Sequence, residues 1–373
     1  MVDTKRLCDY FARLVETDSP TFGERMMCDR LKKYLSALGI ESSEDGAGGE
    51  LNGNAGNLYA YLDGEAGLEP LLFSTHMDTV EPSRGKKAVF LPDGKIVSDG
   101  TTVLGADDLA GVAAILEALS VLRESALPHR PIELVFSVAE EAYCAGIRHF
   151  DLPRIRSRQA YVLDLSGPVG SAAYCAPTIL SFRAEFRGRA AHAAFSPEEG
   201  IHAVKAAAAA ITRIPCGRVG GSTVNIGTVS GGTVDNVVPE SCTVTGEVRS
   251  FSDEDAAKQL GQIKTQLKTA AEEYGARFEV KTKLLCPACG VDEDHPVVRR
   301  FMSACTRAGI EGRLARTYGG SDNNYFALGG ISGLVIAAGM NNCHGCAEYT
   351  SVSELTRAAQ LVLALMLPGE TKE

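Results

Sequence analysis

The sequence predicts an α/β domain that is interrupted by a second, inserted α+β domain. Two observations carry this prediction. Short apolar runs that are typical of buried strands alternate with an apolar, alanine-rich stretch that favours a helix. A long central segment then follows the order strand, helix, strand, strand, helix, strand, which is typical of a ferredoxin-like unit. A chain of 373 residues is long enough to bury a core in each domain.

Four apolar runs predict the buried strands of the first domain, at residues 71–74, 132–138, 161–163 and 334–337. Side chains of the types that hold metals follow in order along the chain: His76, Asp107, Glu140, Glu141, Asp164 and His344. Five of these six lie where an apolar run ends. Ligands of an open α/β sheet gather outside the carboxyl ends of its strands, so we expect these loops to meet at one site.

The spacing of His76 and Asp78 predicts a supported metal ligand. Residues two apart in an extended segment point to the same side. Asp78 is therefore expected to hold the second ring nitrogen of His76, as the outer partners of metal-bound histidines do.

Asp107 precedes a helix predicted at residues 112–119, and two interpretations stay open. An aspartate at a helix start is an ordinary N-cap, but a carboxylate there can also bridge two metal ions. Glu140 and Glu141 are adjacent, so their side chains diverge, and one can bind metal while the other accepts a proton from water. Two histidines with several carboxylates suit zinc, with cobalt or manganese as substitutes.

The inserted domain is expected at residues 177–286, which leaves residues 1–176 and 287–373 for the first domain. Pro177 and the stretch 286–296, rich in proline, glycine and acids, predict the two connections. The expected strands are 181–187, 223–228, 242–250 and 277–284, and the expected helices are 200–214 and 253–274.

Together these motifs resemble the di-zinc metallopeptidase family of peptidase T, glutamate carboxypeptidase, aminoacylase and succinyl-diaminopimelate desuccinylase, most closely its peptidase T-like branch. The motifs span most of the chain in the family's order. They are Ser-Thr-His76-Met-Asp78-Thr-Val, Gly-Ala-Asp107-Asp-Leu-Ala-Gly, Ala-Glu140-Glu141, Asp164, Arg-Ala-Ala-His192, Gly319-Gly320-Ser321-Asp322, His344-Gly345 and Glu348.

The resemblance implies a zinc-peptidase-like catalytic domain, with a mixed sheet between helices, and two Zn²⁺ per subunit. His76 and Asp164 would bind one ion, Glu141 and His344 the other, and Asp107 would bridge them. Glu140 would be the general base and Asp78 the support of His76. The inserted ferredoxin-like domain would act as a lid and carry the contact of a homodimer.

Four further residues are expected to contact substrate because they match the family's motifs. His192 would stabilise the oxyanion, Arg249 would pair with a substrate carboxylate, and Asn236 would lie near the substrate. Gly320 would present backbone donors. The structural alternatives are a solvated loop histidine for His192 and an ordinary surface arginine on a strand for Arg249.

Composition limits the partners and the compartment. A net charge of −10 argues against nucleic acid or an anionic membrane surface as the natural partner. We expect no signal peptide and no membrane span, and the odd number of eleven cysteines suits reduced thiols in a cytoplasm. The pairs Cys286/Cys289 and Cys343/Cys346 have the spacing of zinc ligands, but their separation is too long for a zinc ribbon, and inert thiols are preferred.

The expected activity is hydrolysis of short peptides by a metal-activated water, in the manner of a tripeptide aminopeptidase. Three alternatives stay open. The same site could serve an N-acyl amino acid deacylase or desuccinylase, or a carboxypeptidase, and the chain could instead be a metal-binding scaffold without catalysis. Glu140 argues against the scaffold, because a scaffold needs no proton acceptor beside its metal.

Overall fold

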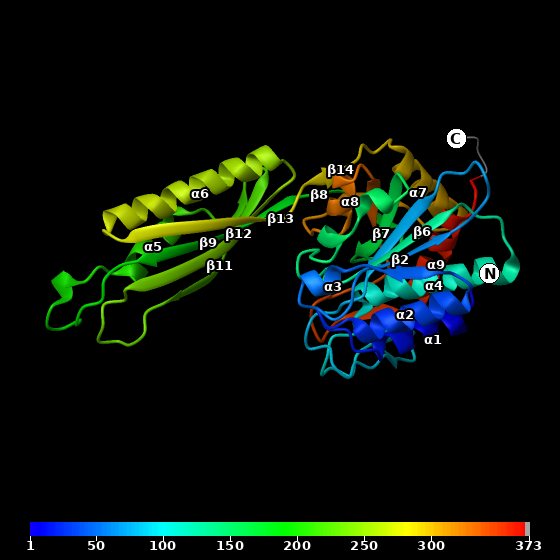
Figure 1. Cartoon of the computed structure of the whole chain (residues 1–373), viewed down its shortest axis with the longest axis horizontal. Helices are drawn as coiled ribbons and strands as arrows, with labels where there is room; N and C mark the ends of the chain where they lie inside the picture. Colours follow the sequence, from blue (N-terminus) through cyan, green and yellow to red (C-terminus); the bar gives the residue numbers. More distant parts are fainter. Residues whose placement is uncertain (370–373) are drawn as a thin grey trace. The chain divides into compact units, whose positions relative to one another are not determined.

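The computed structural model describes residues 1–369, which form two compact units (Figure 1). The discontinuous unit consists of Met1–Cys175 and the chain from Gly290 onward, and the inserted unit is Ala176–Cys289. Each unit has its own hydrophobic core. The α/β fold with an inserted ferredoxin-like domain, predicted from the sequence, is confirmed.

The discontinuous unit is built on a mixed sheet with the order β1-β2-β6-β3-β7-β16-β8-β14, with β15 beside β8. Its centre is parallel, and antiparallel pairs flank it. The parallel strands are β3 (Leu71–His76), β6 (Ile132–Ser137), β7 (Gln159–Leu165) and β16 (Ser332–Ala337). The outer strands are β1 (Ser42–Glu44), β2 (Leu58–Leu62), β8 (Ser171–Ala176), β14 (Cys289–Gly290) and β15 (Arg313–Arg316).

The strand order changes direction at β3. The chain passes from β3 to β6 on one side and then to β7 on the other, and all three strands run parallel. A switch of this kind opens a crevice at the carboxyl ends of the strands, where ligands of open α/β sheets bind. His76 is the last residue of β3 and therefore lies at this switch point.

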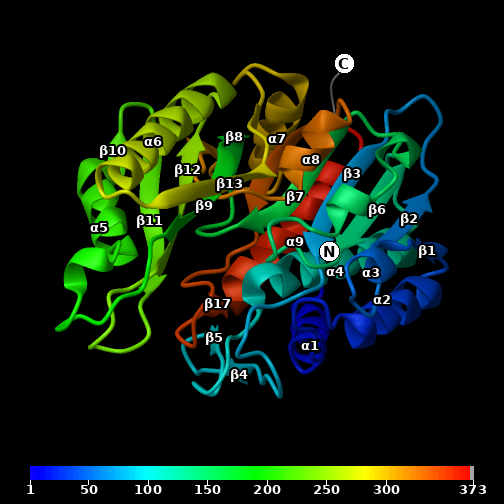
Figure 2. The ribbon, with the colours of Figure 1, turned by 60° about the vertical axis from the view of Figure 1, so that its left-hand side comes forward.

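Helix α4 (Ala106–Ser125) is the central helix of the discontinuous unit. Its residues from Ala106 to Leu122 are all buried, because it packs on β3 and β7 and is covered by α1 (Thr4–Val15) and α9 (Val352–Met366). A helix that is apolar all round belongs inside a core. Figures 1 and 2 show the C-terminal α9, in red, lying along α4.

Shorter elements complete the discontinuous unit. The remaining helices are α2 (Arg25–Ala37), α3 (Ala47–Glu50), α7 (Pro296–Arg307) and α8 (Asn323–Leu328). A small second sheet, which the sequence pattern did not predict, has the order β17-β5-β4 and consists of β4 (Val89–Phe90), β5 (Lys95–Val97) and β17 (Tyr349–Ser351).

The inserted unit is an antiparallel sheet covered on one face by two helices. The sheet order β10-β11-β12-β9-β13 places the fourth long strand beside the first, as in a ferredoxin-like unit. Its elements are β9 (Thr178–Arg187), α5 (Ala203–Arg213), β10 (Gly217–Val219), β11 (Ser222–Gly231), β12 (Ser241–Ser250), α6 (Asp253–Glu273) and β13 (Arg277–Cys286). Only the short β10 was not expected.

The core of the inserted unit follows from period-two burial. Phe182, Ala184 and Phe186 of β9 point inward against the helices, whereas the neighbouring Arg183 and Arg187 are exposed. Such alternation is typical of an antiparallel sheet with one solvated face.

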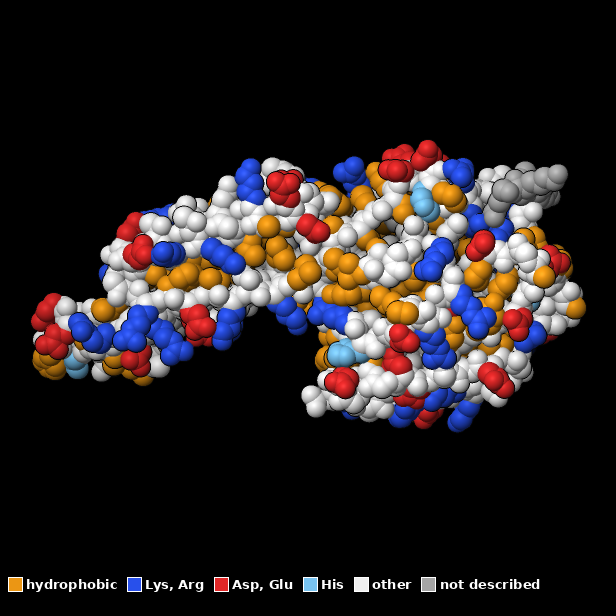
Figure 3. All heavy atoms as spheres, turned by 45° about the horizontal axis from the view of Figure 1, so that its top comes forward, with side chains coloured by type: hydrophobic (Ala, Val, Ile, Leu, Met, Phe, Trp, Pro, Cys, Tyr) orange, Lys and Arg blue, Asp and Glu red, His pale blue; other side chains and the backbone are white. Residues whose placement is uncertain are grey.

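Basic and acidic side chains are interspersed on the face drawn in Figure 3. All eleven cysteines are free thiols. Among residues 1–369, no helix is both long and apolar enough to cross a membrane.

Candidate active site

His76 is the fixed point of the site. It ends β3, is 1% exposed, and its Nδ1 lies 2.9 Å from the backbone oxygen of Asp78. The Asp78 carboxylate, which the sequence suggested as the ring's partner, is farther away at 3.4 Å. An Nδ1–H donated to the Asp78 backbone oxygen leaves Nε2 with its lone pair toward the site, as a metal-ligating histidine requires.

Asp107 lies between two histidines. Its Oδ1 is 3.1 Å from Nε2 of His76, and its Oδ2 is 3.2 Å from Nε2 of His344. Nε2 of His344 is also 3.1 Å from Oε2 of Glu141. Both carboxylate oxygens of Asp107 thus face histidines, an arrangement that the helix-cap interpretation does not account for.

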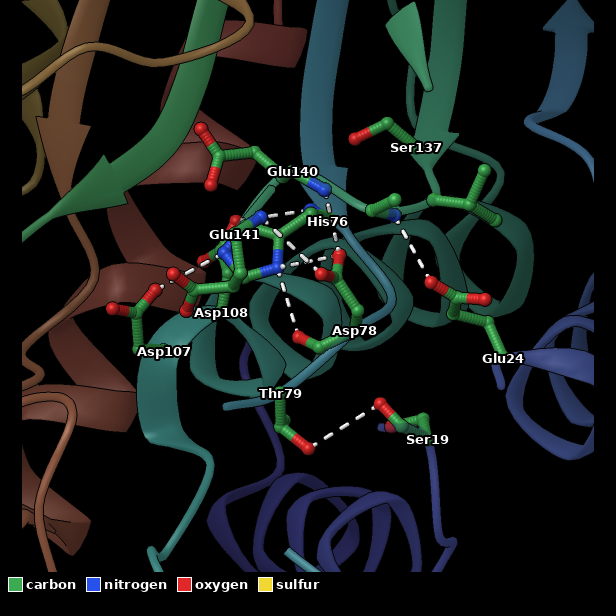
Figure 4. Close-up of polar contacts among 12 residues, drawn as sticks. Ser19, Glu24, His76, Asp78, Thr79, Asp107, Asp108, Ser137, Glu140 and Glu141 are labelled. Atoms are coloured by element: carbon green, nitrogen blue, oxygen red, sulfur yellow. Dashed lines mark hydrogen bonds and ion pairs between the residues drawn. The ribbon is translucent and has the colours of Figure 1, made fainter. Parts of the chain in front are cut away.

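Glu140, in the loop after β6, and Asp164, on β7, complete the cluster. Ligand atoms of His76, Glu140 and Asp164 lie within 4.8 Å of one another, as do those of His76, Asp107 and Glu141. The structure therefore brings together all six metal-type residues predicted from the sequence. Figure 4 shows Asp107, Glu140 and Glu141 gathered around His76.

The cluster concentrates negative charge in a buried space. Burial raises the pKa of Glu140 and of Asp164 well above their ordinary values, and neighbouring carboxylates add to the effect. Asp107 and Glu141 raise the pKa of His344 to about 10. Burial alone would lower the pKa of His76, but hydrogen bonds to Asp107 and Asp78 raise it. Each of these shifts favours added positive charge.

A pair of divalent cations fits this donor set. Histidine nitrogens and carboxylate oxygens are the ligands that zinc takes in catalytic sites. Oε1 of Glu141 is buried and has no hydrogen-bond partner among the described residues, so a ligand atom is available beside His344. The two oxygens of Asp107 face different histidines, which is the arrangement that a carboxylate shared by two ions needs.

Several buried acids support the site that were given no role from the sequence. Glu348 accepts hydrogen bonds from the backbone N–H groups of Gly105 (2.7 Å) and Asp107 (2.9 Å), and so fixes the segment before α4. Asp108 accepts a long hydrogen bond of 3.4 Å from the His76 backbone. Both residues stood in the quoted motifs, but the sequence assigned neither of them a role.

A second set of contacts surrounds the Glu140 side chain. The Cys144 thiol donates to Oε1 of Glu140 at 3.2 Å, and ligand atoms of Glu140, Cys144 and Asp322 lie within 4.8 Å of one another. Ser137 at the end of β6 donates its hydroxyl to the Asp322 carboxylate. Asp322 was recognised only as part of the Gly-Gly-Ser-Asp turn.

The inserted unit brings two of its three predicted residues together. His192 and Asn236 lie on paired loops. The Ala193 N–H donates to the backbone oxygen of Asn236 at 2.9 Å, and His192 forms a β-bridge with Val237. Nδ1 of the exposed His192 accepts the backbone N–H of Ala194 at 3.2 Å, so its Nε2 carries the proton in the neutral ring.

Arg249 lies toward the opposite end of β12 from these loops. Ser241, where β12 begins, pairs with Arg187, whereas Arg249 pairs with Ile179 at the start of β9. Its guanidinium binds both oxygens of Glu247, at 2.8 and 3.1 Å. The remaining predicted residue, Gly320, belongs to the discontinuous unit and lies in the turn between β15 and α8.

The CxxC pairs are not part of a metal-binding group. Among residues 1–369, the three groups of side chains that could hold a metal include none of Cys286, Cys289, Cys343 and Cys346. All four are free cysteines.

Two family profiles match the chain. The peptidase dimerisation domain matches residues 177–275, within the inserted unit. Peptidase family M28 matches residues 57–209, a range that contains the cluster residues from His76 to Asp164.

Relatives of similar length match from end to end. The uncharacterized protein YqjE of Bacillus subtilis is 36% identical, and the match covers 98% of this chain and 99% of YqjE. The crystal structure of aminopeptidase PepT from Bacillus cereus is 37% identical, covers 98% of both chains and superposes with a TM-score of 0.91. A tripeptidase structure from Staphylococcus aureus is 32% identical with the same coverage and a TM-score of 0.95.

Peptidase T of Geobacillus thermodenitrificans is a more distant relative, 26% identical over 74% of this chain and 68% of its own length. Identity above 30% across nearly the whole chain, together with the same fold, shows the relationship. The chain therefore belongs to the peptidase T-like family of metallopeptidases and is a metal-dependent peptidase.

Proposed function

We propose that this protein is a di-zinc aminopeptidase that removes the amino-terminal residue of short peptides. One observation carries the proposal: Asp107 turns one oxygen toward His76 and the other toward His344, with the buried Glu140 beside them. Two of the similar solved structures are described as an aminopeptidase and a tripeptidase, and this supports short peptides as the substrate.

The ligand sets follow from the two halves of the cluster. His76 and Asp164 would hold one zinc ion, and Glu141 and His344 would hold the other, with Asp107 shared. The contacts of Asp107 with both histidines and of His344 with Glu141 support this division. Cobalt or manganese would serve the same ligands.

Bound zinc would supply two effects, polarisation of the scissile carbonyl and a lowered pKa of water in the site. Glu140 would take a proton from the attacking water and return it to the leaving amine. Burial raises the pKa of Glu140, and the positive charge of bound zinc would lower that pKa again, so that the carboxylate could accept the proton. Asp78 would keep His76 and the Glu140 loop in place.

The inserted unit would supply substrate contacts and the dimer interface. His192 and Asn236, on paired loops, would act together on the reacting carbonyl. Arg249, whose Nε and Nη2 now contact Glu247, would bind a substrate carboxylate. Gly320 would offer its backbone N–H to the substrate. The match to the peptidase dimerisation domain supports a homodimer formed through this unit.

A panel of tripeptides tests the proposal. The zinc-loaded protein would be offered free tripeptides beside their N-acetylated and C-amidated forms, with products identified by mass. Release of the first residue only from peptides with a free amine is the expected result. The Glu140→Gln variant, purified in the same way, controls for contaminating peptidases.

The panel also separates the alternatives. Cleavage of acylated substrates would replace the aminopeptidase with a deacylase, and release of the last residue would replace it with a carboxypeptidase. A zinc-loaded protein that cleaves no member of any class would contradict the proposed activity.

A further inference from the structure

The loop that carries Glu140 and Glu141 is held by two buried carboxylates. Three consecutive backbone N–H groups point into them. The Ala139 N–H donates to Oε1 of Glu24 at 3.0 Å, and the N–H groups of Glu140 and Glu141 donate to the two oxygens of Asp78 at 3.0 and 3.2 Å. Figure 4 shows Glu24 and Asp78 reaching this loop, Glu24 from the blue N-terminal segment.

Glu24 makes backbone contacts and no ion pair among the described residues. It precedes α2, is 0% exposed, and its Oε1 also accepts the Phe22 N–H at 2.8 Å. Its other oxygen, Oε2, is buried without a hydrogen-bond partner. Burial, with Asp78 nearby, raises the pKa of Glu24 to about 7. Burying a carboxylate without a paired cation costs free energy of folding. We therefore expect the hydrogen bonds of Glu24 to serve the loop that it contacts.

The loop needs such a hold because its backbone is strained. Ala139, Tyr143 and Cys144 have φ values of 50°, 61° and 56°, in the left-handed region that side chains disfavour. Such a backbone conformation is energetically unfavourable for a residue with a side chain and persists only when its surroundings fix it. The contact with Glu24 fixes the first of the three, immediately before Glu140.

We propose that Glu24 is a positioning residue of the reaction, which holds the Ala139 N–H and thereby keeps the Glu140 carboxylate in its working place. This inference rests on the proposed role of Glu140. Among the described residues, Glu24 makes its hydrogen bonds with the backbone N–H groups of Phe22 and Ala139 and with none of the metal-type side chains. Its effect passes through one backbone N–H to the next residue.

A displaced base slows the chemistry more than it weakens binding. A shift of about 1 Å in a catalytic group can cost roughly a hundredfold in rate. Glu24→Ala should therefore lower kcat by about ten- to a hundredfold, with KM changed less than about twofold. Glu24→Asp should also lower kcat, because the shorter side chain withdraws the acceptor while the charge stays. Glu24→Gln should recover kcat to within a few-fold, because its amide oxygen can accept the same N–H.

Glu133 is a matched control. It is also 0% exposed, lies on β6, and accepts the backbone N–H groups of Ser157 (2.6 Å) and Arg156 (3.0 Å), away from the catalytic loop. Glu133→Ala should lower the thermal unfolding midpoint and leave kcat of the folded protein unchanged. A purely structural role for Glu24 would give the same pattern.

Amide hydrogen exchange tests the hold without any substrate. In the zinc-loaded protein, the peptide that contains Ala139 should exchange at least tenfold faster in Glu24→Ala and Glu24→Asp than in wild type or Glu133→Ala. If wild type hydrolyses no peptide, the proposed function fails, while this exchange measurement still decides whether Glu24 holds the loop.

The experiment is exchange and steady-state kinetics on the same five proteins, with zinc content measured on each. Faster exchange at Ala139 with a lower kcat, an unchanged KM and recovery in Glu24→Gln supports the inference. Unchanged exchange overturns it, and so does an unchanged kcat in Glu24→Asp or an equal loss of kcat in Glu133→Ala. Glu24→Asp keeps the test valid if Glu24→Ala does not fold.

Discussion

Nε2 of His76 lies 3.1 Å from Oδ1 of Asp107, although the two residues come from different elements, the end of β3 and the start of α4. The second oxygen of Asp107 is thereby turned toward His344. One carboxylate thus links the two halves of the cluster, and most of the chemistry proposed for the site depends on it.

Replacement of Asp107 should uncouple the two metal positions. In Asp107→Asn, the amide removes the negative charge that two cations would share, so zinc content should fall below two ions per chain. Loss of a residue that only supports a metal ligand typically lowers activity by about 10- to 100-fold. Asp107 is a proposed ligand itself, so activity should fall by more than about 100-fold. Elemental analysis and peptide hydrolysis check both effects. The exposed Asp99→Asn should retain metal and activity, and full zinc content in Asp107→Asn would contradict the shared-ligand assignment.

Glu140→Gln should separate metal binding from catalysis. The amide cannot accept the proton of the attacking water, and loss of a general base typically costs about 10²–10⁴ in rate. Zinc content should be unchanged, because Glu140 is outside the proposed ligand set. Stopped assays of tripeptide cleavage with elemental analysis measure both. Full activity in a metal-loaded Glu140→Gln protein would show that another group moves the proton.

Removal of metal should destabilise the protein as well as inactivate it. Asp107, Glu141 and Asp164 repel one another in a buried space, and a bound cation offsets that repulsion. Free zinc at 100 times its dissociation constant would add about 2.7 kcal/mol to the free energy of unfolding. Calorimetry of zinc-loaded and chelator-treated protein should show a lower unfolding midpoint after treatment, restored by zinc but not by magnesium. Identical midpoints would argue against a cation in the cluster.

Glu44 gives a pH dependence away from the site. Burial alone would raise the pKa of Glu44, but hydrogen bonds from Arg25 and Lys32 lower it to about 2. Because its pKa is lowered in the folded protein, the ionised Glu44 stabilises the fold at pH values above 4.5, the ordinary pKa of the group. This contribution is lost as the pH falls toward 2. Glu44→Gln should lower the free energy of unfolding at pH 7 by about 1–3 kcal/mol.

The difference between Glu44→Gln and wild type should shrink between pH 4.5 and 2. Urea unfolding of metal-free protein across this range measures it, with the exposed Glu41→Gln as control. A difference that stays constant with pH would show that the Glu44 charge is not the cause.

The dimer contact should use the β11 edge of the inserted sheet. β10 pairs only with residues 222–224, and the rest of β11 carries no charged side chain, with Val229 53% exposed. The opposite edge strand, β13, carries Arg277, Lys281 and Lys283, and charged edges resist pairing. Light scattering should give twice the chain mass of 39.5 kDa for wild type.

Val229→Lys should convert this dimer to a monomer, whereas Leu284→Lys on β13 should not. A dimer that survives Val229→Lys would place the contact elsewhere.

The sequence predicted those parts of the site in which residue type and strand position coincide. His76 and Asp164 lie on apolar strands, and Glu140 and Glu141 follow one, so alternation of strands and helices sufficed to bring them to one edge. The position of Asp107 between two histidines was harder to predict, because an aspartate at a helix start looks like an ordinary cap.

The supporting residues could not be predicted in the same way. Glu24 acts through a backbone N–H more than a hundred residues away in sequence, and no residue pattern records such a contact. Asp78 was expected to hold the His76 ring, and its carboxylate lies 3.4 Å from Nδ1 of His76. The same carboxylate also accepts two backbone N–H groups of the catalytic loop, which the sequence did not indicate. Strand periodicity gives the side on which a side chain lies, whereas its partner depends on how distant loops pack.

The pairing of Ile179 with Cys286 has a practical consequence for gene engineering. Paired residues of neighbouring antiparallel strands have Cα atoms about 5 Å apart, so the chain enters and leaves the inserted unit at almost the same point. A two-residue glycine turn can bridge that gap. The discontinuous unit could thus be expressed as a single shortened chain, in which zinc titration would report on the cluster alone. The inserted unit could likewise be exchanged between relatives as one segment.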